Sequence, residues 1–411
     1  MSEARLRPSP PFAFEGATVN KRSVRDLDVS GKKVLVRVDF NVPVGDGKVT
    51  DDTRIRRALP TIRHLLKGGA QPALISHLGR PKGEPDPKYA MNPVAGRLEE
   101  LLGAPVEKLD TAVGPEVEEA LNESNGEGVV LLENSRFYPG ETKNAPEFSE
   151  QLAAPFDLYV DDAFGAAHRA HATTVGVAEL LPAAAGLLME EEIDNLNKVL
   201  RDPERPFVAI LGGAKVSDKV AVIESLLEVA DTLLIGGAMC FTFFKAQGYE
   251  IGESMLEDDY LEEAERLMAE AGERLVLPVD VVVAEEIEEN ADARVVRVEE
   301  IPSDMMGLDI GSETVEKFGG YTTEARTIFW NGPMGVFEID AFAKGTEGIA
   351  RGVAEGEAIS IVGGGDSVAA VRKLGLENEM GFISTGGGAS LEYVEGKELP
   401  GVAVLPDKEE G

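Results

Sequence analysis

Short apolar runs alternate with longer segments in which apolar residues recur at helical spacing, from about residue 33 onward. Runs of four or five aliphatic residues are typical of strands buried on both faces, and their alternation with amphipathic helices is typical of βαβ units around a parallel sheet. The pattern therefore predicts an α/β protein. We predict strands at 34–38, 72–76, 129–132 and 157–160 in the first half, and at 207–211, 232–235, 279–283, 327–330, 358–362 and 382–384 in the second.

The same pattern suggests where the chain divides. Its 411 residues exceed the length at which one hydrophobic core usually keeps growing, so we expect two domains. An acidic amphipathic stretch from Leu187 to Leu200, followed by a proline-marked loop at 201–206, is the candidate connector. A helical pattern at 55–66 contains Pro60, which makes a kink or a break possible. Residues 1–20, with three prolines, are expected to form a poorly ordered extension.

Charge excludes some classes of partner. The chain has 74 acidic and 40 basic residues, a formal net charge of −34, so we expect no binding to nucleic acid or to anionic membranes. The excess is spread along helical faces, which we interpret as adaptation to a salty cytoplasm, where screening weakens self-repulsion. No long apolar run or leader pattern is visible, and the single cysteine, Cys240, lies in an apolar context typical of buried packing. A cytoplasmic protein is expected.

Glycine-rich turns follow several strands of the second half. Gly363-Gly364-Gly365-Asp366-Ser367 leads into a helical pattern, so backbone N–H groups and the helix dipole would face an anion such as a phosphate. Gly386-Gly387-Gly388 repeats the arrangement, and Asp366 could hold an associated Mg²⁺. The alternative is that these glycines only form tight turns.

A second lysine-bearing turn follows the strand at 207–211. Lys215 and Lys219 stand four residues apart at the start of a predicted helix, where both could reach phosphate oxygens. The turn lacks the spacing of a Walker A loop, and no strand leads into a dinucleotide-binding glycine pattern. A solvated lysine pair beside Asp218 is the alternative.

Polar and basic residues follow the strands of the first half. If these strands are parallel neighbours, their loops emerge at one sheet edge, where arginine side chains and a histidine could enclose a small phosphate and a carboxylate. Taken singly, each arginine could instead be a surface ion-pair partner, and we interpret His64 and His171 as structural. The candidates are Asp39, Asn41, Arg54, His77, Arg80, Arg136 and Arg169.

Five strings in one order resemble the 3-phosphoglycerate kinase family. They span much of the chain, and five in register are far more specific than any one alone. The strings are Arg37-Val38-Asp39-Phe40-Asn41-Val42-Pro43, Ser76-His77-Leu78-Gly79-Arg80-Pro81, Gly212-Gly213-Ala214-Lys215-Val216-Ser217-Asp218-Lys219, Asn331-Gly332-Pro333-Met334-Gly335-Val336-Phe337-Glu338 and Gly364-Gly365-Asp366-Ser367.

The resemblance implies two Rossmann-like domains with parallel sheets joined by a hinge helix. It also implies a C-terminal tail that returns to the first domain. The boundaries we expect are 21–186 for a phosphoglycerate-binding domain, 187–205 for the hinge helix and linker, 206–395 for a nucleotide-binding domain and 396–411 for the tail.

The resemblance also implies an activity: reversible phosphoryl transfer between 1,3-bisphosphoglycerate and ADP, with Mg²⁺, giving 3-phosphoglycerate and ATP, in glycolysis and gluconeogenesis. We expect a monomer. The resemblance directs Asp39, Asn41, Arg54, His77, Leu78, Gly79, Arg80, Arg136 and Arg169 toward the phosphoglycerate, and Lys215, Lys219, Asn331, Glu338, Gly364, Gly365, Asp366 and Ser367 toward the nucleotide.

The chemistry suits this reaction because a carboxylate is already ionised at neutral pH and requires no general base. We hypothesise that Arg54, Lys215 and the turn at Gly387 and Gly388 stabilise the transferring group, and that the two domains close over their substrates. Two alternatives stay open: a nucleotide-binding or scaffold protein without turnover, and a kinase of another small carboxylic acid.

Overall fold

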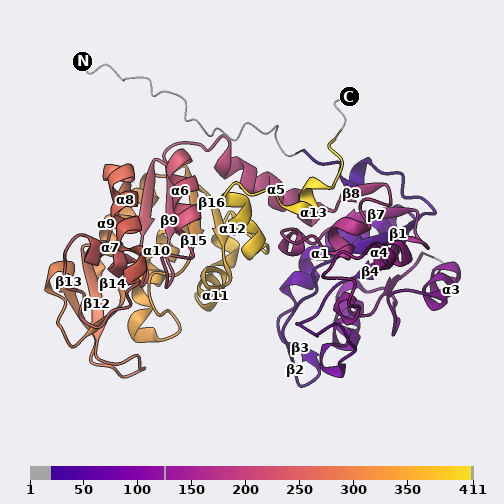
Figure 1. The fold of residues 1–411 in the computed structure, drawn as a ribbon, viewed down its shortest axis with the longest axis horizontal. Coiled ribbons are helices and arrows are strands. Elements are labelled where there is room, and N and C mark those ends of the chain that lie inside the picture. The colour runs from indigo at the N-terminus through magenta and orange to yellow at the C-terminus, as the bar shows by residue number, and fades with distance from the viewer. Residues whose placement is uncertain (1–19, 125, 409–411) are drawn as a thin grey trace, which may run out of the picture. The chain divides into compact units, whose positions relative to one another are not determined.

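The computed structural model describes residues 20–124 and 126–408. Apart from Asn20, the predicted extension at 1–20 lies outside these residues. The described chain forms two compact units: an N-terminal unit of residues 20–194 with 398–408, and a C-terminal unit of residues 195–397 (Figure 1). No helix in the described ranges combines the length and the apolar character needed to cross a membrane.

The N-terminal unit contains a six-stranded sheet in which every pair is parallel, in the order β5-β6-β4-β1-β7-β8. Arg37 at the end of β1 is in register with Ile75 of β4 and Asp161 of β7, so these strands end together. The strands are β1 (Lys33–Arg37), β4 (Gln71–Ile75), β5 (Val106–Lys108), β6 (Val129–Leu131), β7 (Leu158–Asp161) and β8 (Ala183–Ala185).

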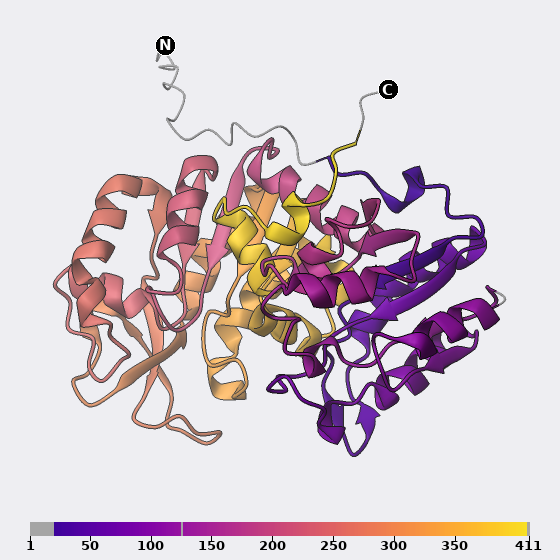
Figure 2. The same cartoon turned by 45° about the vertical axis from the view of Figure 1, so that its right-hand side comes forward.

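Helices pack against this sheet (Figure 2). They are α1 (Thr53–Lys67), α2 (Asn92–Leu102), α3 (Pro115–Glu123) and α4 (Pro146–Ala153), and a small hairpin pairs β2 (Val44–Gly45) with β3 (Lys48–Val49). The core is continuous from β1 to α1, whose Ile55, Leu59 and Ile62 are buried at helical spacing. Pro60 lies inside α1, and the helix continues past it to Lys67 without a break.

The C-terminal unit contains a second six-stranded parallel sheet, in the order β11-β10-β9-β15-β16-β17. The predicted α/β class with two parallel sheets is thereby confirmed. The strands are β9 (Phe207–Leu211), β10 (Thr232–Ile235), β11 (Leu275–Val276), β15 (Thr327–Asn331), β16 (Ile359–Gly363) and β17 (Phe382–Ile383), and the helices are α6 (Val220–Val229), α7 (Cys240–Ala246), α8 (Leu261–Ala271), α9 (Ser312–Glu324), α10 (Lys344–Glu355), α11 (Gly365–Lys373) and α12 (Gly388–Val394).

One predicted strand of this half lies elsewhere. The apolar run at 279–283 forms β12 (Asp280–Ala284), which pairs antiparallel with β13 (Arg294–Arg297) and β14 (Met306–Ile310) in a separate sheet. Every residue of β12 is buried. A strand buried on both faces has the same continuous apolar pattern in either kind of sheet, which explains why the sequence did not distinguish the two.

The helix predicted from Leu187 to Leu200 is α5 (Leu187–Leu200). Its first turn is anchored to the N-terminal unit, because the backbone N–H of Leu188 donates to Asp162 Oδ1 over 2.8 Å. The short helix α13 (Pro400–Ala403) belongs to the same unit, where the N–H of Gly401 donates to the carbonyl oxygen of Ala167 over 2.8 Å. Cys240 is buried, which raises the pKa of its thiol, as its apolar context predicted.

Candidate functional site

The carboxyl ends of four strands bring the predicted basic residues of the N-terminal unit to one sheet edge. β1, β4, β6 and β7 are neighbours, and each is followed by a loop that carries one or more of the candidates. Parallel strands direct these loops to the same side of the sheet, where α/β proteins bind ligands. The loops hold Asp39 and Asn41, His77 to Arg80, Arg136 in the 3₁₀ turn η3 (Ser135–Phe137), and Arg169.

Hydrogen bonds link these loops to one another. Arg54, on the first turn of α1, donates from Nη1 to Asp39 Oδ2 over 2.7 Å. Asn41 Oδ1 accepts from the backbone N–H of Gly79 over 2.8 Å, and Arg136 Nη1 donates to the carbonyl oxygen of Gly79 over 2.7 Å. The loop after β4 is therefore held on two sides by candidate residues.

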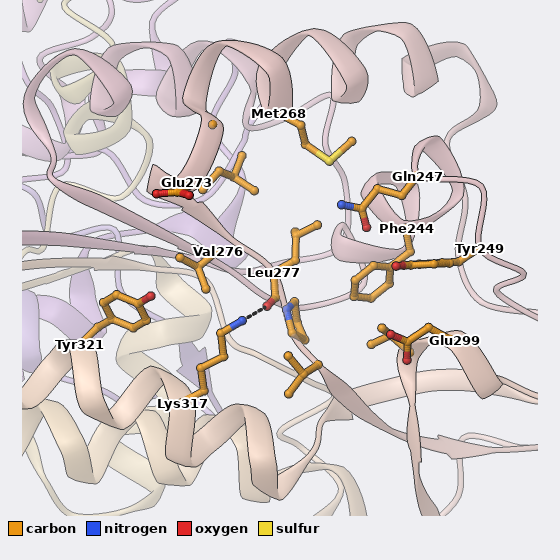
Figure 3. A pocket seen from close by; sticks show the side chains of 15 residues that line it. Phe244, Gln247, Tyr249, Met268, Glu273, Val276, Leu277, Glu299, Lys317 and Tyr321 are labelled. Atoms are coloured by element: carbon orange, nitrogen blue, oxygen red, sulfur yellow. Dashed lines mark hydrogen bonds between the residues drawn. The ribbon is translucent and has the colours of Figure 1, made fainter.

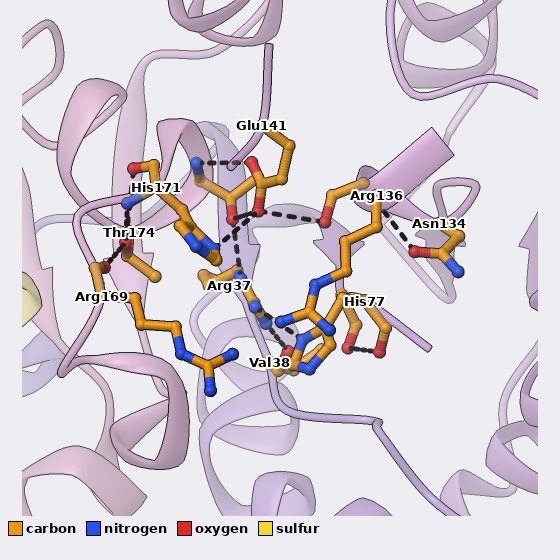
Figure 4. Close-up of polar contacts among 12 residues, drawn as sticks. Arg37, Val38, His77, Asn134, Arg136, Glu141, Arg169, His171 and Thr174 are labelled. Carbon is orange, nitrogen blue, oxygen red and sulfur yellow. Dashed lines mark hydrogen bonds and ion pairs between the residues drawn. The ribbon is translucent and has the colours of Figure 1, made fainter. Parts of the chain in front are cut away.

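The cations at this edge lie close enough to perturb one another (Figure 4). Burial, together with the charges of Arg169 and Arg37, lowers the pKa of Arg136 to about 10. Burial and the surrounding arginines lower the pKa of His77 well below its usual range and that of His171 to about 4. His171 Nδ1 lies 3.8 Å from Glu141 Oε1, but a neutral imidazole makes this a dipolar contact and not an ion pair.

The environment of Arg136 points to an anionic ligand. Its Nε is buried and, among the described residues, has no hydrogen-bond partner. Of the other predicted residues at this edge, Arg80 and Arg169 are exposed, and Leu78 is buried. An unpartnered guanidinium nitrogen among like charges is costly, and a bidentate phosphate or carboxylate would offset that cost.

The C-terminal unit has a corresponding edge at the ends of β9, β15 and β16. Asn331, the last residue of β15, is in register with Leu211 of β9 and Gly363 of β16. Lys219 Nζ donates to Asn331 Oδ1, and burial lowers the pKa of this lysine. Asn331 Nδ2 is buried without a hydrogen-bond partner in the described part of the chain. Lys215 is exposed in the loop after β9.

The predicted glycine turns occur where two helices begin. Gly364 has a φ of +89° and precedes α11, and Gly387 has a φ of +55° and precedes α12, so both adopt conformations that favour glycine. A side chain at 364 would collide with Asn331 Nδ2, which lies 2.7 Å from the position of its Cβ. Gly365 and Gly388 begin these helices, and Asp366 is exposed.

Two further candidates border this edge. Ser367 is fully buried, and its Oγ accepts from the backbone N–H of Gly332 over 2.6 Å, which ties α11 to the loop after β15. Glu338 is exposed in the same loop. Among residues 20–124 and 126–408, no three His, Cys, Asp or Glu side chains are grouped so as to hold a metal ion.

Comparison with known proteins identifies the family. A family model described as phosphoglycerate kinase matches residues 24–397. A phosphoglycerate kinase from Rubrobacter xylanophilus is 76% identical over 392 residues, which are 95% of this chain and 100% of that protein. The chain belongs to the phosphoglycerate kinase family. It is thus related to phosphotransferases with a carboxyl group as acceptor.

Other relatives of this family agree in sequence and in fold. A phosphoglycerate kinase from Moorella thermoacetica is 56% identical over 391 residues, 94% of this chain and 100% of that protein. The structure of phosphoglycerate kinase from Coxiella burnetii has a TM-score of 0.86 at 41% identity, covering 94% of this chain and 98% of that one. The crystal structure of the enzyme from Pyrococcus horikoshii has a TM-score of 0.82 at 34% identity, with 93% and 98% covered.

Three buried residues near the predicted site were not predicted as site residues, although one of them, Arg37, begins a string that resembles the family. Arg37, Glu141 and Thr173 are each at most 1% exposed and form a hydrogen-bonded chain that ends at His77. Of the three, only Arg37 could have been noticed in the sequence, because a charged residue within the apolar run 34–38 is unusual in a buried strand.

A cavity of about 520 Å³ lies in the C-terminal unit away from the predicted residues (Figure 3). Side chains of α7, α8 and α9 line it, among them Phe244, Met268 and Tyr321. Lys317 borders it and donates to the carbonyl oxygen of Leu277 over 3.2 Å. None of the predicted nucleotide-binding residues contributes to its lining.

Proposed function

We propose that this protein transfers a phosphoryl group reversibly between 1,3-bisphosphoglycerate and ADP, giving 3-phosphoglycerate and ATP. The observation that carries the proposal is the cation cluster at the edge of the N-terminal sheet, where Arg136 and the neutral ring of His77 are buried among arginine side chains. Such a cluster suits a small ligand with a phosphate and a carboxylate better than a singly charged acid. Family membership supports the same substrate.

We assign the two sheet edges to the two substrates. The phosphoglycerate is bound through Asp39, Asn41, Arg54, His77, Leu78, Gly79, Arg80, Arg136 and Arg169. The nucleotide is bound through Lys215, Lys219, Asn331, Glu338 and Gly364 to Ser367. The amide Nδ2 of Asn331, which has no partner within residues 20–124 and 126–408, and the positive-φ turn at Gly364 support the second assignment, because both offer N–H donors to phosphate oxygens.

Catalysis then consists of positioning and charge stabilisation. In the ATP-consuming direction the substrate carboxylate is the nucleophile, so no side chain has to remove a proton. Arg54, Lys215 and the backbone at Gly387 and Gly388 stabilise the charge on the transferring group. Arg54 is suited to this because its partner Asp39 fixes the position of its guanidinium.

Mg²⁺ fits the C-terminal edge as an ion that arrives with the nucleotide. Asp366 is a single exposed carboxylate at the start of α11, and Mg²⁺ usually takes one or two carboxylates together with phosphate oxygens. When bound, the ion neutralises charge on the nucleotide phosphates. Asp366 would hold it, while Lys219 and Asn331 keep contacts of their own with the phosphates.

We further propose that the chain works as a monomer in a salty cytoplasm and that α5 is its hinge. The net charge of −34 supports the first point, because screening by salt relieves the self-repulsion of so acidic a surface. The position of α5, which crosses the boundary between the units at residues 194 and 195, supports the second.

One assay tests the proposed reaction. The protein is incubated with ATP, Mg²⁺ and 3-phosphoglycerate in concentrated potassium chloride, and the acyl phosphate product is reduced in a coupled reaction. We expect turnover with 3-phosphoglycerate and none with acetate, which lacks the phosphate that Arg136 and His77 would bind. Equal turnover of both acids would assign the chain to another carboxylate kinase, and no turnover with either would favour a binding role.

A further inference from the structure

Arg37 is a buried cation whose hydrogen bonds are all made inside the protein. It ends β1 and is 1% exposed. Its Nε donates to Thr173 Oγ1 over 2.9 Å, its Nη1 donates to the carbonyl oxygen of Val38, and its Nη2 lies 3.0 Å from His77 Nδ1. An arginine bonded in this way has little freedom left to bind a ligand.

The contact with His77 fixes where the imidazole carries its proton. A guanidinium remains protonated in proteins and has no acceptor, so Arg37 Nη2 must be the donor and His77 Nδ1 the acceptor. A ring that accepts at Nδ1 carries its proton on Nε2 and is neutral. The imidazolium, with protons on both nitrogens, would direct one of them at the guanidinium.

A carboxylate behind Arg37 holds the guanidinium in place. Thr173 Oγ1, which accepts from Arg37, donates in turn to Glu141 Oε1 over 2.6 Å. Glu141 is fully buried, and it also accepts from Ser135 Oγ over 3.2 Å and from the backbone N–H of Thr173 over 3.0 Å. Carboxylate, hydroxyl, guanidinium and imidazole thus form one chain of directed hydrogen bonds (Figure 4).

We infer that Arg37, held by Thr173 and Glu141, is a positioning residue that fixes His77 as a neutral Nε2–H donor toward the substrate anion. This inference rests on the proposed role of His77 in binding phosphoglycerate. A hydrogen bond to the ring nitrogen that faces away from the ligand sets the tautomer and orientation of histidines that bind ligands. His77 then contributes a directed hydrogen bond, while the arginines contribute the positive charge.

The other groups that face His77 act in the same direction. Arg54 comes from α1, Arg136 from η3, and His171 from the segment before the π-helical turn η5 (Ala172–Gly176). Burial, followed by the positive charges of Arg37, Arg136 and Arg54, lowers the pKa of His77 well below its usual range. Binding through His77 should therefore not change with pH where a free imidazole titrates.

The first measurement uses the unmodified protein without substrate. Nitrogen-15 NMR of the His77 ring reports the protonation of each nitrogen between about pH 5 and 8, where an ordinary imidazole titrates. We expect a proton on Nε2 and none on Nδ1 throughout. A proton on Nδ1, or an ordinary titration in this range, would overturn the inference without any variant.

The second measurement compares variants by the ratio of their KM for 3-phosphoglycerate to that of the unmodified protein at each pH. The substrate phosphate titrates in the same way in both assays, so its effect on KM divides out of this ratio. Arg37→Gln replaces a pure donor by an amide that can also accept, so His77 is free to protonate. We expect a ratio on the order of ten at pH 8, with kcat nearly unchanged, because a charge-assisted hydrogen bond to the ring is lost. The ratio should fall toward acid pH as an imidazolium forms.

Three further variants separate positioning from a merely structural role. Arg37→Lys keeps a cation without an acceptor and should restore a ratio that does not vary with pH. Arg37→Gln combined with Glu141→Gln removes both buried charges, so it serves if the single variant does not fold. The matched control is Arg63→Gln, an exposed arginine of the same unit whose Nη2 donates to the carbonyl oxygen of Leu101, and its ratio should stay near one.

The outcomes also separate this inference from the proposed function. An unchanged KM in His77→Ala would remove His77 from substrate binding and overturn the inference, but it would leave the proposed reaction in place. Failure of the proposed reaction is seen separately, as an absence of turnover of 3-phosphoglycerate by the unmodified protein. A second outcome is that His77→Ala raises the KM while the KM ratio for Arg37→Gln stays constant with pH. This outcome would leave the proposed function in place and overturn the positioning role.

Discussion

Arg54 shows how one side chain can be held by the protein and still be available to a substrate. Its Nη1 is bonded to Asp39 Oδ2 and lies 3.3 Å from the carbonyl oxygen of Asn41, yet its side chain remains 34% exposed. The bonds fix the direction of the guanidinium at no reorganisation cost during the reaction. Preorganised charge of this kind is the largest single contribution to many enzyme rates.

We therefore expect Arg54→Ala to lower kcat by on the order of 10² or more, the usual cost of losing a donor to the transition state. Steady-state kinetics with saturating ATP and 3-phosphoglycerate measures it. The matched control is Arg56→Ala, two residues along α1, where the lost arginine pairs with Asp52 at the surface. A kcat for Arg54→Ala close to that of Arg56→Ala would refute the assignment of Arg54.

Site residues at the strand ends could be predicted from sequence, but the buried residues that hold them in place could not. Asp39 and His77 are polar residues that follow the apolar strands β1 and β4, and a parallel sheet brings such positions together. Glu141 lies in a turn and Thr173 in the short π-helical turn η5, and neither segment has a periodic apolar pattern. Their burial depends on how these segments pack. Glu141 is one of 74 acidic residues, and nothing in the sequence distinguishes it from those that lie in solvent.

At the scale of elements, α11 connects two parts of the proposed nucleotide site. Its first turn carries Asp366 and Ser367, and at its other end Lys373 donates from Nζ to the carbonyl oxygens of Phe337 and Glu338 over 3.0 and 3.2 Å. Lys373 also donates to Asp340 Oδ1 over 2.8 Å, which lowers the pKa of that carboxyl. One helix thus positions the glycine turn and holds the loop of Glu338.

Lys373→Met should loosen this loop and raise the KM for ATP several-fold, while the KM for 3-phosphoglycerate and kcat change little. The reason is that two backbone carbonyls lose a charged donor whose bonds contribute roughly 1.5–3 kcal/mol in favourable cases, and less at this partly exposed site. Titration of each substrate separately measures the effect. Arg351→Met, a surface change on α10, is the control. Equal increases in both KM values would argue against a local role in the nucleotide site.

The start of α5 depends on a buried carboxyl group. Asp162 Oδ1 accepts from the backbone N–H of Leu188 and Met189 over 2.8 and 3.4 Å. Burial raises the pKa of Asp162 to about 8, with a smaller contribution from Asp161, although Thr61 and the helix N–H groups act in the opposite direction. The group therefore retains a proton in the folded state at pH values where the unfolded chain has lost it.

This gives a pH dependence with a definite sign. Between the unfolded value of 3.8 and the folded value of about 8, the folded state binds the extra proton, so stability falls as pH rises. Asp162→Asn keeps the acceptor at Oδ1 and cannot ionise. As pH rises, the free energy of unfolding of this variant should fall less steeply than that of the unmodified protein. The two slopes should differ by up to about 1.4 kcal/mol per pH unit. Urea unfolding from pH 5 to 8 measures the slopes, with Glu107→Gln, a change at an exposed residue of β5, as control. Parallel slopes for Asp162→Asn and the unmodified protein would contradict this account.

Elements whose sequences have a clear hydrophobic pattern were predicted well, and elements without such a pattern were missed. The strands at 207–211 and 232–235 and the helix at 187–200 have the predicted bounds. β8 consists of three alanines, and β5 is partly exposed with two charged residues, so neither has the apolar run that indicates a strand. They form strands because they pair with neighbouring strands of the parallel sheet, and not because their own sequences have a strand pattern.

At the scale of the whole molecule, the charge of −34 should make stability depend on salt. The Debye length falls from about 10 Å at 0.1 M to about 3 Å at 1 M, so like charges on the surface repel one another over much shorter distances. We expect the melting temperature to drop on transfer from molar potassium chloride to dilute buffer. Concentrated sucrose is the control, because it is excluded from the protein surface but does not screen charge. Equal melting temperatures at low and high potassium chloride would exclude salt adaptation.

Closure is the remaining expectation for the whole molecule, and it follows from the chemistry. The residues we assign to phosphoglycerate belong to one unit and those assigned to nucleotide belong to the other. Transfer requires reacting atoms within about 3.5 Å and the exclusion of water, which would hydrolyse the acyl phosphate. A chain that binds each substrate on a separate unit must bring both together. α5 passes from the N-terminal to the C-terminal unit, and the chain crosses back between residues 397 and 398.

Small-angle scattering measures this closure with ADP and 3-phosphoglycerate, a pair that has no phosphoryl group to transfer and so stays bound without reacting. We expect a smaller radius of gyration with both ligands than with either ligand alone or with none. The single ligands are the matched controls, because each occupies one edge without completing the site. A radius that does not change with both ligands bound would mean that transfer occurs without closure, and α5 would then be a connector and not a hinge.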